Sequence, residues 1–361
     1  MFREEQQIGG ISMKKLLALV MMLALALPFG ALAAETYELA LVTDVGNIDD
    51  QSFNQSTWEG VKKYAEENGK TYAYYRPSED SNDARVESIK AAIAKGAKVV
   101  VLPGYLFADA VAAVQNEYPD VTFIVVDTAP AGEAGKNTYS FIYQEEQAGY
   151  LAGYGIVKDG YTKLGFLGGM AVPAVVRFGY GFVQGVDAAA KELGVTPEIK
   201  YWYADSFGPN DDIKTKMNAW YTEGTEVVFA CGGGIYLSAL AAAEESGHGK
   251  LIGVDNDQGP ISELFITSAF KDIPNTIVDA LTAYYANGQK LPEDMQGALV
   301  TFSVKEDRVG LPTSEGSWRF AKFTLDVYNA IYAKLKGGSV VVSADIDNAP
   351  AVEVSTVDYQ N

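Results

Sequence analysis

The stretch TDVGNIDDQSFNQSTWEG, from Thr43 to Gly60, concentrates side chains that could do chemistry. It holds three aspartates, followed by the aromatic ring of Phe53 and the amide of Asn54. Carboxylates at this density can hold a cation, act as general acids and bases, or accept hydrogen bonds from a polar ligand. The stretch is therefore compatible with three kinds of site: a metal site, a catalytic site and a ligand-binding site.

A calcium site is the first alternative, because the stretch looks like the D-x-D-x-x-x-D-D turn with which nucleoside hydrolases hold calcium. The likeness fails twice. Val42 stands where the first carboxylate would be, and the loop is one residue longer before Asp49 and Asp50. Calcium takes about six to eight oxygen ligands, and the missing carboxylate would be a main one. We expect no metal site, and a calcium-dependent nucleoside hydrolase is the less favoured alternative.

Other catalytic patterns are weaker still. The single histidine, His248, lies in a polar helix-to-strand turn, and the single cysteine, Cys231, is interpreted as a small residue at a strand end. The segment CGGG lacks the Lys-Ser/Thr of a phosphate-binding loop, and no G-x-S-x-G motif occurs. We therefore predict that the protein is not an enzyme and uses no cofactor.

The elements that would position these residues alternate between apolar strands and Ala-rich helices. YELALVT, KTYAYY, AKVVVLP and VTFIVVD read as strands, with a helical stretch after each of the first three. Nearly all-apolar strands are typical of a parallel sheet that is covered on both faces. The first hundred residues after the leader are thus expected to form one doubly wound lobe.

The same plan occurs twice in the chain. A Phe-Gly-Gly set recurs at intervals of 7 and 9 residues, and a Tyr-Gly-Gly-Asp set recurs at intervals of 21, 8 and 23 residues. The first copies are Phe53, Gly60, Gly69 and Tyr75, Gly96, Gly104, Asp127; the second are Phe178, Gly185, Gly194 and Tyr203, Gly224, Gly232, Asp255. The repeat predicts two equivalent α/β lobes. Ligands of open parallel sheets bind beyond the carboxyl ends of the strands, so we expect Asp44 and Asp127 to face Asp255 across a cleft.

The chain is expected to return to the first lobe near its end. The strand GALVTFSVK would extend the first sheet, and a last helix, from about Ser317 to Leu335, would belong to the second lobe, followed by an irregular tail. We assign residues 36–143 and 271–305 to lobe 1, and residues 144–270 and 306–361 to lobe 2.

Residues 1–33 are predicted to be a cleavable signal peptide. From Met13, which we take as the start, two lysines precede an apolar run, and Ala31-Leu32-Ala33 provides a small-residue cleavage site. The run is shorter than the roughly 20 residues that cross a bilayer. Because no cysteine is present for lipid attachment at the cleavage region, we expect an unanchored protein of the periplasm.

The formal net charge of −19 argues against nucleic acid as a partner, because phosphate backbones are bound by clustered basic residues. We interpret the excess of acidic residues as a solvated surface that keeps the protein soluble.

Five segments carry a resemblance to a known family. TDVGNIDDQSFNQSTWEG, VVRFGYGFVQGV, VVFACGGG, IGVDNDQ and ITSAFK resemble the basic membrane protein family of ABC transporter substrate-binding proteins, which includes purine-nucleoside receptors. The resemblance runs from about Tyr37 to Leu311. It implies a type I periplasmic binding protein fold, with two doubly wound parallel-sheet lobes joined by three crossovers. It also implies a purine nucleoside as the ligand and an ABC permease as the membrane partner, and we expect the protein to be a monomer.

The resemblance further implies which residues bind the ligand. At positions that match the family's motifs stand Asp44, Phe53, Asn54, Asp127, Gly232, Asp255 and Lys271, together with a second ring from lobe 2. For that ring the repeat makes Phe178 the counterpart of Phe53, whereas the segment DSFGPND offers Phe207, which we favour slightly.

We expect the two rings to sandwich a nucleobase, each contributing about 1–3 kcal/mol by stacking. Asp255 and Lys271 are expected to bind the ribose diol, and Asp44, Asn54 and Asp127 the base. Three carboxylates and one lysine would repel phosphate, which favours nucleosides over nucleotides. Two alternatives share these residues: a receptor for another flat or polyhydroxylated ligand, and a sensor component instead of an importer.

The other two aspartates of the first stretch have a structural explanation. Asp49 and Asp50 are interpreted as the turn and the cap that begin the following helix.

Overall fold

The computed structural model describes residues 36–360. The predicted signal peptide and the start at Met13 lie outside the described residues. Between residues 36 and 360, no helix has the length and the apolar content that a membrane span requires.

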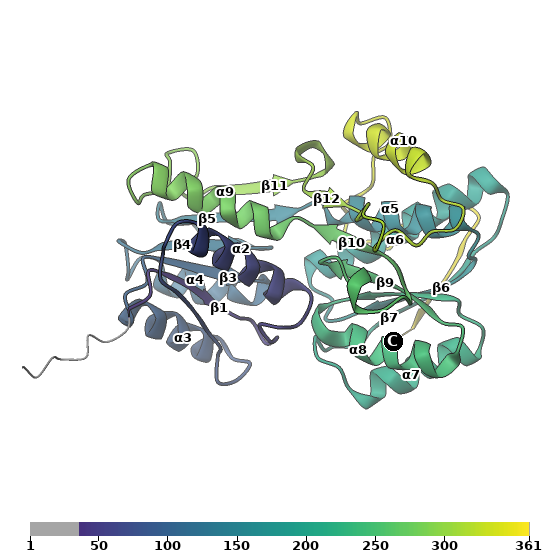
Figure 1. Ribbon diagram of the computed structural model, residues 1–361, viewed down its shortest axis with the longest axis horizontal. Coiled ribbons are helices and arrows are strands. Elements are labelled where there is room, and N and C mark those ends of the chain that lie inside the picture. Colours follow the sequence, from purple (N-terminus) through teal and green to yellow (C-terminus); the bar gives the residue numbers. More distant parts are fainter. Residues whose placement is uncertain (1–35, 361) are drawn as a thin grey trace, which may run out of the picture. The chain divides into compact units, whose positions relative to one another are not determined.

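Six parallel strands form the first sheet, in the spatial order β11-β5-β4-β3-β1-β2 (Figure 1). Their bounds are β1 (Leu39–Val42), β2 (Tyr72–Tyr75), β3 (Val99–Pro103), β4 (Thr122–Val126), β5 (Thr138–Tyr143) and β11 (Leu299–Phe302). The helices of this lobe are α2 (Phe53–Glu67), α3 (Asn82–Ala94), α4 (Ala108–Val114) and α9 (Ile273–Ala286), with the 3-10 turn η1 (Tyr105–Phe107) before α4. As expected from GALVTFSVK, β11 extends this sheet beside β5.

Seven strands form the second sheet, in the order β12-β10-β9-β8-β6-β7-β13, with the β10–β12 pair antiparallel and the other pairs parallel. Their bounds are β6 (Lys163–Gly168), β7 (Glu198–Tyr203), β8 (Val227–Cys231), β9 (Lys250–Asp255), β10 (Phe265–Lys271), β12 (Val309–Gly310) and β13 (Thr356–Gln360). The helices are α5 (Glu145–Asp159), α6 (Pro173–Leu193), α7 (Asp211–Thr222), α8 (Tyr236–Ser246) and α10 (Leu325–Lys336), with the 3-10 turns η2 (Gly233–Ile235), η3 (Gly259–Ile261) and η4 (Val304–Glu306).

The strand order confirms the repeat that the spacing predicts. In the first sheet β2, β1, β3, β4 and β5 lie side by side, and in the second sheet β7, β6, β8, β9 and β10 lie in the same succession. The chain passes between the sheets three times: after β5, after β10 and between β11 and β12. The two sheets are therefore copies of one plan, and in each sheet the parallel strands end along a comparable edge.

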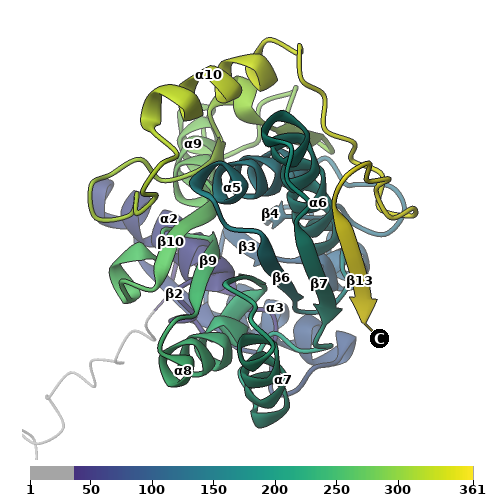
Figure 2. The ribbon, with the colours of Figure 1, turned by 90° about the vertical axis from the view of Figure 1, so that its right-hand side faces the viewer.

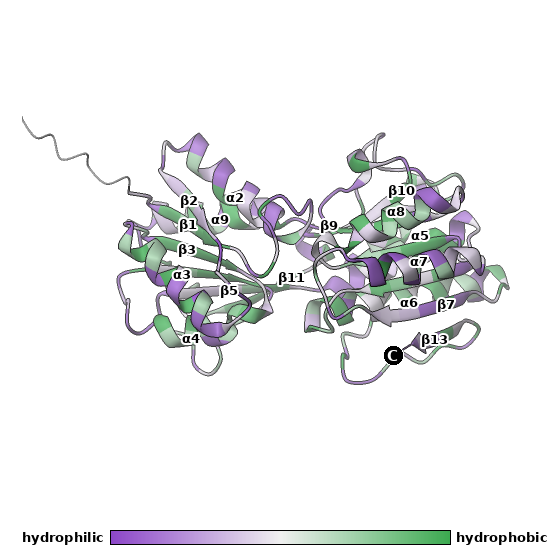
Figure 3. Cartoon of the chain, turned by 90° about the horizontal axis from the view of Figure 1, so that it is seen from below, coloured by the Kyte–Doolittle hydropathy of each residue, from purple (hydrophilic) through white to green (hydrophobic). Residues whose placement is uncertain are grey.

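Both faces of each sheet are apolar because both are covered by helices. In β1, Leu39 and Leu41 belong to a cluster that includes residues of α2, whereas Ala40 and Val42 pack with residues of α3 and α4. All four are fully buried. Figure 3 shows the same pattern as hydrophobic strands between helices whose outer faces are hydrophilic. Continuous apolar runs are what such doubly covered strands require.

Two expectations for the C-terminal region were wrong. The last helix, α10, begins at Leu325 instead of about Ser317, because Thr324 accepts a hydrogen bond from the Val327 N–H and caps the helix there. The end of the tail is also regular, since Thr356–Gln360 forms β13 parallel to β7 (Figure 2).

The tail reaches the edge of β7 because α6 holds it. The Asp187 carboxylate on α6 accepts hydrogen bonds from three consecutive backbone N–H groups, those of Glu353, Val354 and Ser355. These bonds lower the pKa of Asp187 against the opposing effect of burial. Asp187 and Glu353 are 166 residues apart in the chain, so the local sequence pattern of the tail could not predict this contact.

Candidate ligand-binding site

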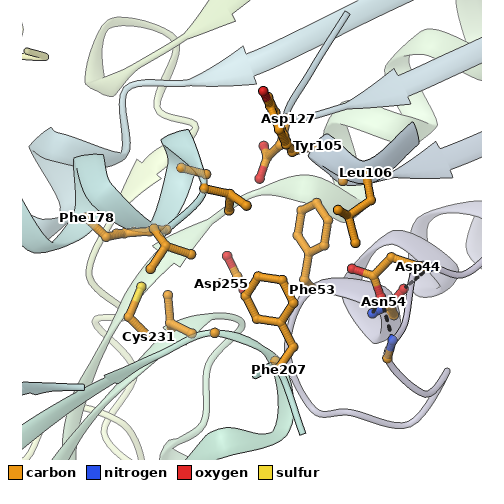
Figure 4. A pocket seen from close by; sticks show the side chains of 18 of the residues that line it. Asp44, Phe53, Asn54, Tyr105, Leu106, Asp127, Phe178, Phe207, Cys231 and Asp255 are labelled. Carbon is orange, nitrogen blue, oxygen red and sulfur yellow. Dashed lines mark hydrogen bonds between the residues drawn. The ribbon is translucent and has the colours of Figure 1, made fainter. Parts of the chain in front are cut away.

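The carboxyl ends of strands from both sheets line one cavity, with an empty volume of about 640 Å³, its open mouth included. All nine residues predicted from the sequence line this cavity: Asp44, Phe53, Asn54, Asp127, Phe178, Phe207, Gly232, Asp255 and Lys271. Figure 4 labels seven of them, all except Gly232 and Lys271. The structure thus brings the predicted set together from seven separate stretches of the chain.

The loop between β1 and α2 presents Asp44 and Asn54 to the cavity, and Asp50 organises it. Asp50 accepts hydrogen bonds from the backbone N–H groups of Ser52, Asn54 and Gln55. These are donors at the start of α2 that have no partner within the helix. Ser52 stands at the N-cap position without a side-chain capping bond, and the Asp50 carboxylate caps the helix instead, as interpreted from the sequence. Asp49 is exposed.

Asp44 and Asn54 are joined by two hydrogen bonds. The Asp44 N–H donates to Asn54 Oδ1 at 3.1 Å, and Asn54 Nδ2 donates to Asp44 Oδ1 at 2.8 Å. The Gly46 N–H also donates to Asp44 Oδ1, at 2.6 Å. Burial nevertheless raises the pKa of Asp44 to about 6, because the low-dielectric surroundings disfavour its charge more than these donors support it.

Asp127 and Asp255 occupy equivalent places at the carboxyl ends of β4 and β9: Asp127 directly follows β4, and Asp255 is the last residue of β9. Both have left-handed backbones, with φ of 63° and 62°, which few residues other than glycine adopt. Each is more than 90% buried. Non-glycine residues in this conformation persist where the surrounding structure holds them, often at functional sites. The shared geometry turns two carboxylates of the two repeats into the same cavity.

Lys271, at the end of β10, carries its ammonium group into the midst of three carboxylates. Its Nζ lies 2.5 Å from Asp127 Oδ2, 3.3 Å from Asp255 Oδ1 and 3.5 Å from Glu145 Oε1. The side chain is 1% exposed, yet these neighbours raise the pKa of Lys271 above its ordinary value despite desolvation. Burial raises the pKa of Asp127, and Lys271 opposes that shift. This end of the cavity is a buried charge cluster with more acid than base.

The cluster contains one acidic residue that the sequence analysis did not single out. Asp127, which we expect to share the base with Asp44, lies beside Lys271, which Asp255 also contacts. Glu145, the first residue of α5, was missed, although it is fully buried and is held by Arg177 Nε at 2.5 Å. An acidic residue at a helix start has an ordinary capping explanation, so the sequence carried no signal for this role.

The rings divide into two kinds. Phe53 and Phe207 are half-buried and come from the start of α2 and the loop after β7, and Figure 4 shows both rings near the centre of the cavity. Phe178 is 1% exposed, lies within α6 and packs edge-on against Phe229. The Phe207 ring lies close to Gly232, where an added Cβ would stand 3.1 Å from it. The accessible second ring is therefore Phe207, as slightly favoured from the sequence.

Hydrogen bonds also cross from one lobe to the other beside the cavity. Ser52 Oγ, in the loop before α2, donates to Asp255 Oδ2 at 2.8 Å. Gln258 Nε2, after β9, donates to the carbonyl oxygen of Gln51 at 3.0 Å. The loop that presents Phe53 is thus tied to the strand end that presents Asp255.

Several further lining residues were not predicted as binders. They are mostly small or aliphatic: Gly46, Gly104, Tyr105, Leu106, Val172, Ala174, Val175, Cys231, Gly233 and Val254. Gly104 and Cys231 could have been found, because the sequence pattern already places both at strand ends. The Val172–Val175 segment had no polar signature. Cys231 is buried, and burial raises the pKa of its thiol, which disfavours the nucleophilic thiolate.

Within residues 36–360, no group of three or more His, Cys, Asp or Glu side chains is arranged to hold a metal ion. Of the carboxylates of the first stretch, Asp50 accepts hydrogen bonds at the start of α2, Asp44 accepts from Gly46 and Asn54 through Oδ1, and Asp49 is exposed.

Comparison with known proteins places this geometry among binding proteins. The model of the family described as "ABC transporter substrate-binding protein PnrA-like" matches residues 37–335. The "ABC transporter nucleoside-binding protein BmpA" of Lactococcus lactis subsp. cremoris is 30% identical over 314 residues, which cover 80% of this chain and 86% of the relative. "Basic membrane protein A" of Borreliella burgdorferi is 30% identical over 287 residues, covering 78% of this chain and 80% of the relative.

A solved structure confirms the fold class. The crystal structure of an ABC transporter system solute-binding protein from Aeropyrum pernix K1 superposes with a TM-score of 0.74. It covers 86% of this chain and 94% of its own chain at 20% identity, which is evidence for the fold alone. The predicted type I periplasmic binding fold, with two doubly wound parallel sheets, is thereby confirmed.

Proposed function

Because the chain belongs to the family of PnrA-like ABC transporter substrate-binding proteins, we propose that it is a receptor that binds a purine nucleoside in the cavity between its two sheets. A substrate-binding protein of this kind works outside the cytoplasmic membrane, with a small molecule as its ligand and a membrane permease as its partner. We further propose that the ligand is a purine nucleoside, that the protein is located in the periplasm and that it is a monomer. The name of the Lactococcus relative, a nucleoside-binding protein, supports the nucleoside as ligand.

The proposal rests on one observation: the cavity has two polar ends of different chemistry, and two half-buried aromatic rings lie beside them. At one end, Asp44 and Asn54 are joined by hydrogen bonds, and at the other Lys271 lies among carboxylates. Phe53 lies close to both ends, because its ring is 4.8 Å from Lys271 Nζ and an added Cβ at Gly104 would touch both the ring and Asp44 Oδ2. A nucleoside has the matching parts: a flat base with a polar edge, and a sugar with a diol.

Each end suits one part of that ligand. Asp255 and Asp127 can accept hydrogen bonds from neighbouring hydroxyl groups, while the Lys271 ammonium donates one. Asp44 faces the edge of a base that stacks on Phe53 and Phe207. The excess of carboxylates over ammonium groups disfavours a phosphate at the sugar end, so a nucleoside fits better than a nucleotide.

Two lobes connected by three crossovers allow closure around a ligand. We propose lobe 1 as residues 36–143 and 271–305, and lobe 2 as residues 144–270 and 306–361. In hinge closure of this type, the ligand shifts the population from the open to the closed state by as much as its affinity for the closed state exceeds that for the open state.

Calorimetry against a panel of nucleosides, bases, nucleotides and sugars tests the proposal. We expect tight binding of an intact purine nucleoside, and at least about tenfold weaker binding by Phe53→Ala and by Asp255→Ala. Tyr74→Ala and Asp49→Ala are matched controls, since both side chains are exposed outside the cavity lining and should leave affinity unchanged.

Two outcomes would contradict the proposal. Binding of a sugar or another flat molecule in preference to every nucleoside would assign a different ligand to the cavity. Release of free ribose in the presence of calcium, detected by chromatography after incubation, would restore the hydrolase alternative.

A further inference from the structure

Asp44 has one oxygen that is committed to the protein and one that is open. Oδ1 accepts from the Gly46 N–H at 2.6 Å and from Asn54 Nδ2 at 2.8 Å. Among residues 36–360, no hydrogen bond is recorded for Oδ2. An sp² oxygen has two lone pairs, so Oδ1 is saturated whereas both lone pairs of Oδ2 remain available.

Asn54 adds no free donor to this end of the cavity. One Nδ2 hydrogen is directed to Asp44 Oδ1 at 2.8 Å, and the other to Asp50 Oδ2 at 3.0 Å. Its Oδ1 already accepts from the Asp44 N–H, which leaves one lone pair. The amide orientation is set by these three bonds, because a flipped amide would face a backbone donor with its NH₂ group. The side chains of Asp44 and Asn54 therefore offer a ligand acceptors only.

Gly104 keeps the open oxygen within reach of a stacked ring. A Cβ at this position would lie 3.4 Å from Asp44 Oδ2 and 3.5 Å from the Phe53 ring. The residue has φ of 109°, a conformation that glycine adopts without strain. With glycine there, a flat ligand that stacks on Phe53 can place its edge against Oδ2.

We propose that Asp44 selects among purine nucleosides by the hydrogen-bonding character of the base edge, favouring bases that present a ring N–H donor over bases that present a ring acceptor. This inference rests on the proposed function. A 6-oxopurine carries a hydrogen on N1, which Oδ2 can accept. A purine with neither a 6-oxo nor a 6-amino group has a lone pair on N1 and no donor beside it. That lone pair would face the lone pairs of Oδ2 and leave a buried charged acceptor without a donor.

The protonation state of Asp44 gives the selection a pH dependence. Burial is the main cause that raises the Asp44 pKa to about 6. The negative charge of Asp50, from the same loop, raises it further, whereas the hydrogen bonds from Gly46 and Asn54 and the positive charge of Arg85, from α3, lower it. The carboxylate accepts from an N–H, whereas the neutral acid can donate to a ring nitrogen. Binding of an N–H purine should therefore strengthen as the pH rises through about 6, and binding of an acceptor purine should weaken.

Inosine and purine riboside are the probes, because they share the sugar and the ring system and differ in the 6-oxo group and the N1 hydrogen. By calorimetry at about pH 8, we expect inosine to bind at least about tenfold more tightly. At about pH 5 the ratio of the two affinities should fall severalfold. This comparison uses the unaltered protein and needs no variant.

Asp44→Asn inverts the prediction. The new amide can keep its oxygen toward Gly46 and Asn54, which places its NH₂ group where Oδ2 was. Purine riboside should then bind at least as tightly as inosine, and the pH dependence of the ratio should disappear. Asp49→Asn is the matched control: it is the same substitution in the same loop, at an exposed position, and should leave both affinities and their ratio unchanged.

The outcomes separate this inference from the proposed function. If neither nucleoside binds at either pH, the nucleoside receptor is the wrong assignment. If both bind but the ratio stays near one, or is the same at both pH values, the receptor stands and the selection by Asp44 is refuted. An Asp44→Asn protein that is folded and retains the preference for inosine also refutes it.

Discussion

Lys271→Met tests the charge cluster of the cavity. Methionine has a similar length and no charge, so the substitution removes the ammonium group and leaves little empty space. Lys271 is 1% exposed and lies within 3.5 Å of carboxylate oxygens from three residues, Asp127, Glu145 and Asp255. Breaking a buried ion pair by removing one partner costs about 3–5 kcal/mol, because the remaining charge is left without compensation. We expect a loss of that size in the free energy of unfolding.

Guanidinium unfolding of the ligand-free protein measures this loss. Lys98→Met is the matched control, since Lys98 pairs with Glu38 at 3.5 Å but its side chain is 51% exposed. An exposed pair of this kind contributes less than about 1 kcal/mol. A double variant with Asp127→Asn should be less destabilised than Lys271→Met alone, because it removes one of the uncompensated charges.

The loss should depend on pH in a defined direction. Burial holds the pKa of Asp127 above its unfolded value, and removing the ammonium raises that pKa further. A group with a raised folded pKa binds its proton more tightly in the folded state, so its contribution to stability is present at low pH and is lost as the pH rises through the folded pKa. The deficit of Lys271→Met should therefore be larger at about pH 8 than at about pH 5. A deficit no larger than that of the Lys98 control, or one that does not change with pH, would refute this account.

Three further variants probe the rings, the lobe contact and a helix crossing. Phe207→Ala should weaken nucleoside binding by about 1–3 kcal/mol in calorimetry with little loss of stability. Phe178→Ala should instead lower the free energy of unfolding by about 3–5 kcal/mol. The reverse pattern would make Phe178 the stacking ring. Ser52→Ala removes the hydrogen bond to Asp255 between the lobes, which should favour the open state. Small-angle scattering should then show a larger radius of gyration for the ligand-free protein. An unchanged radius would mean that this bond does not contribute to closure. Gly181→Ala would place a Cβ 2.1 Å from a backbone oxygen of α5. Thermal unfolding should show that the free energy of unfolding falls by about 1–3 kcal/mol or more. An unchanged midpoint would mean that the contact between α5 and α6 accommodates the added methyl group.

Much of the fold follows from local pattern. Apolar strands alternate with helical stretches. The intervals from Gly104 to Asp127 and from Gly232 to Asp255 are equal because each spans a 3-10 turn, one helix and the next strand of the same plan. Since parallel strands direct their carboxyl ends to one edge, residues that are far apart in the sequence could be predicted to share a cavity. The tail was misjudged because β13 depends on Asp187, a distant acceptor on α6.

By itself, the sequence determined the two-lobed plan and the kind of side chain at each strand end, since both depend on periodicity and spacing along the chain. Only the tertiary structure decided which of these side chains meet. Phe178 matches Phe53 in the repeat, but α6 begins at Pro173, five residues before Phe178, whereas α2 begins at Phe53 itself. Both rings border the cavity, but the same interval buries the Phe178 ring within α6 and leaves the Phe53 ring half-exposed. Likewise, the neighbours of Lys271 come from distant segments, and their distances are set by how the lobes pack against each other.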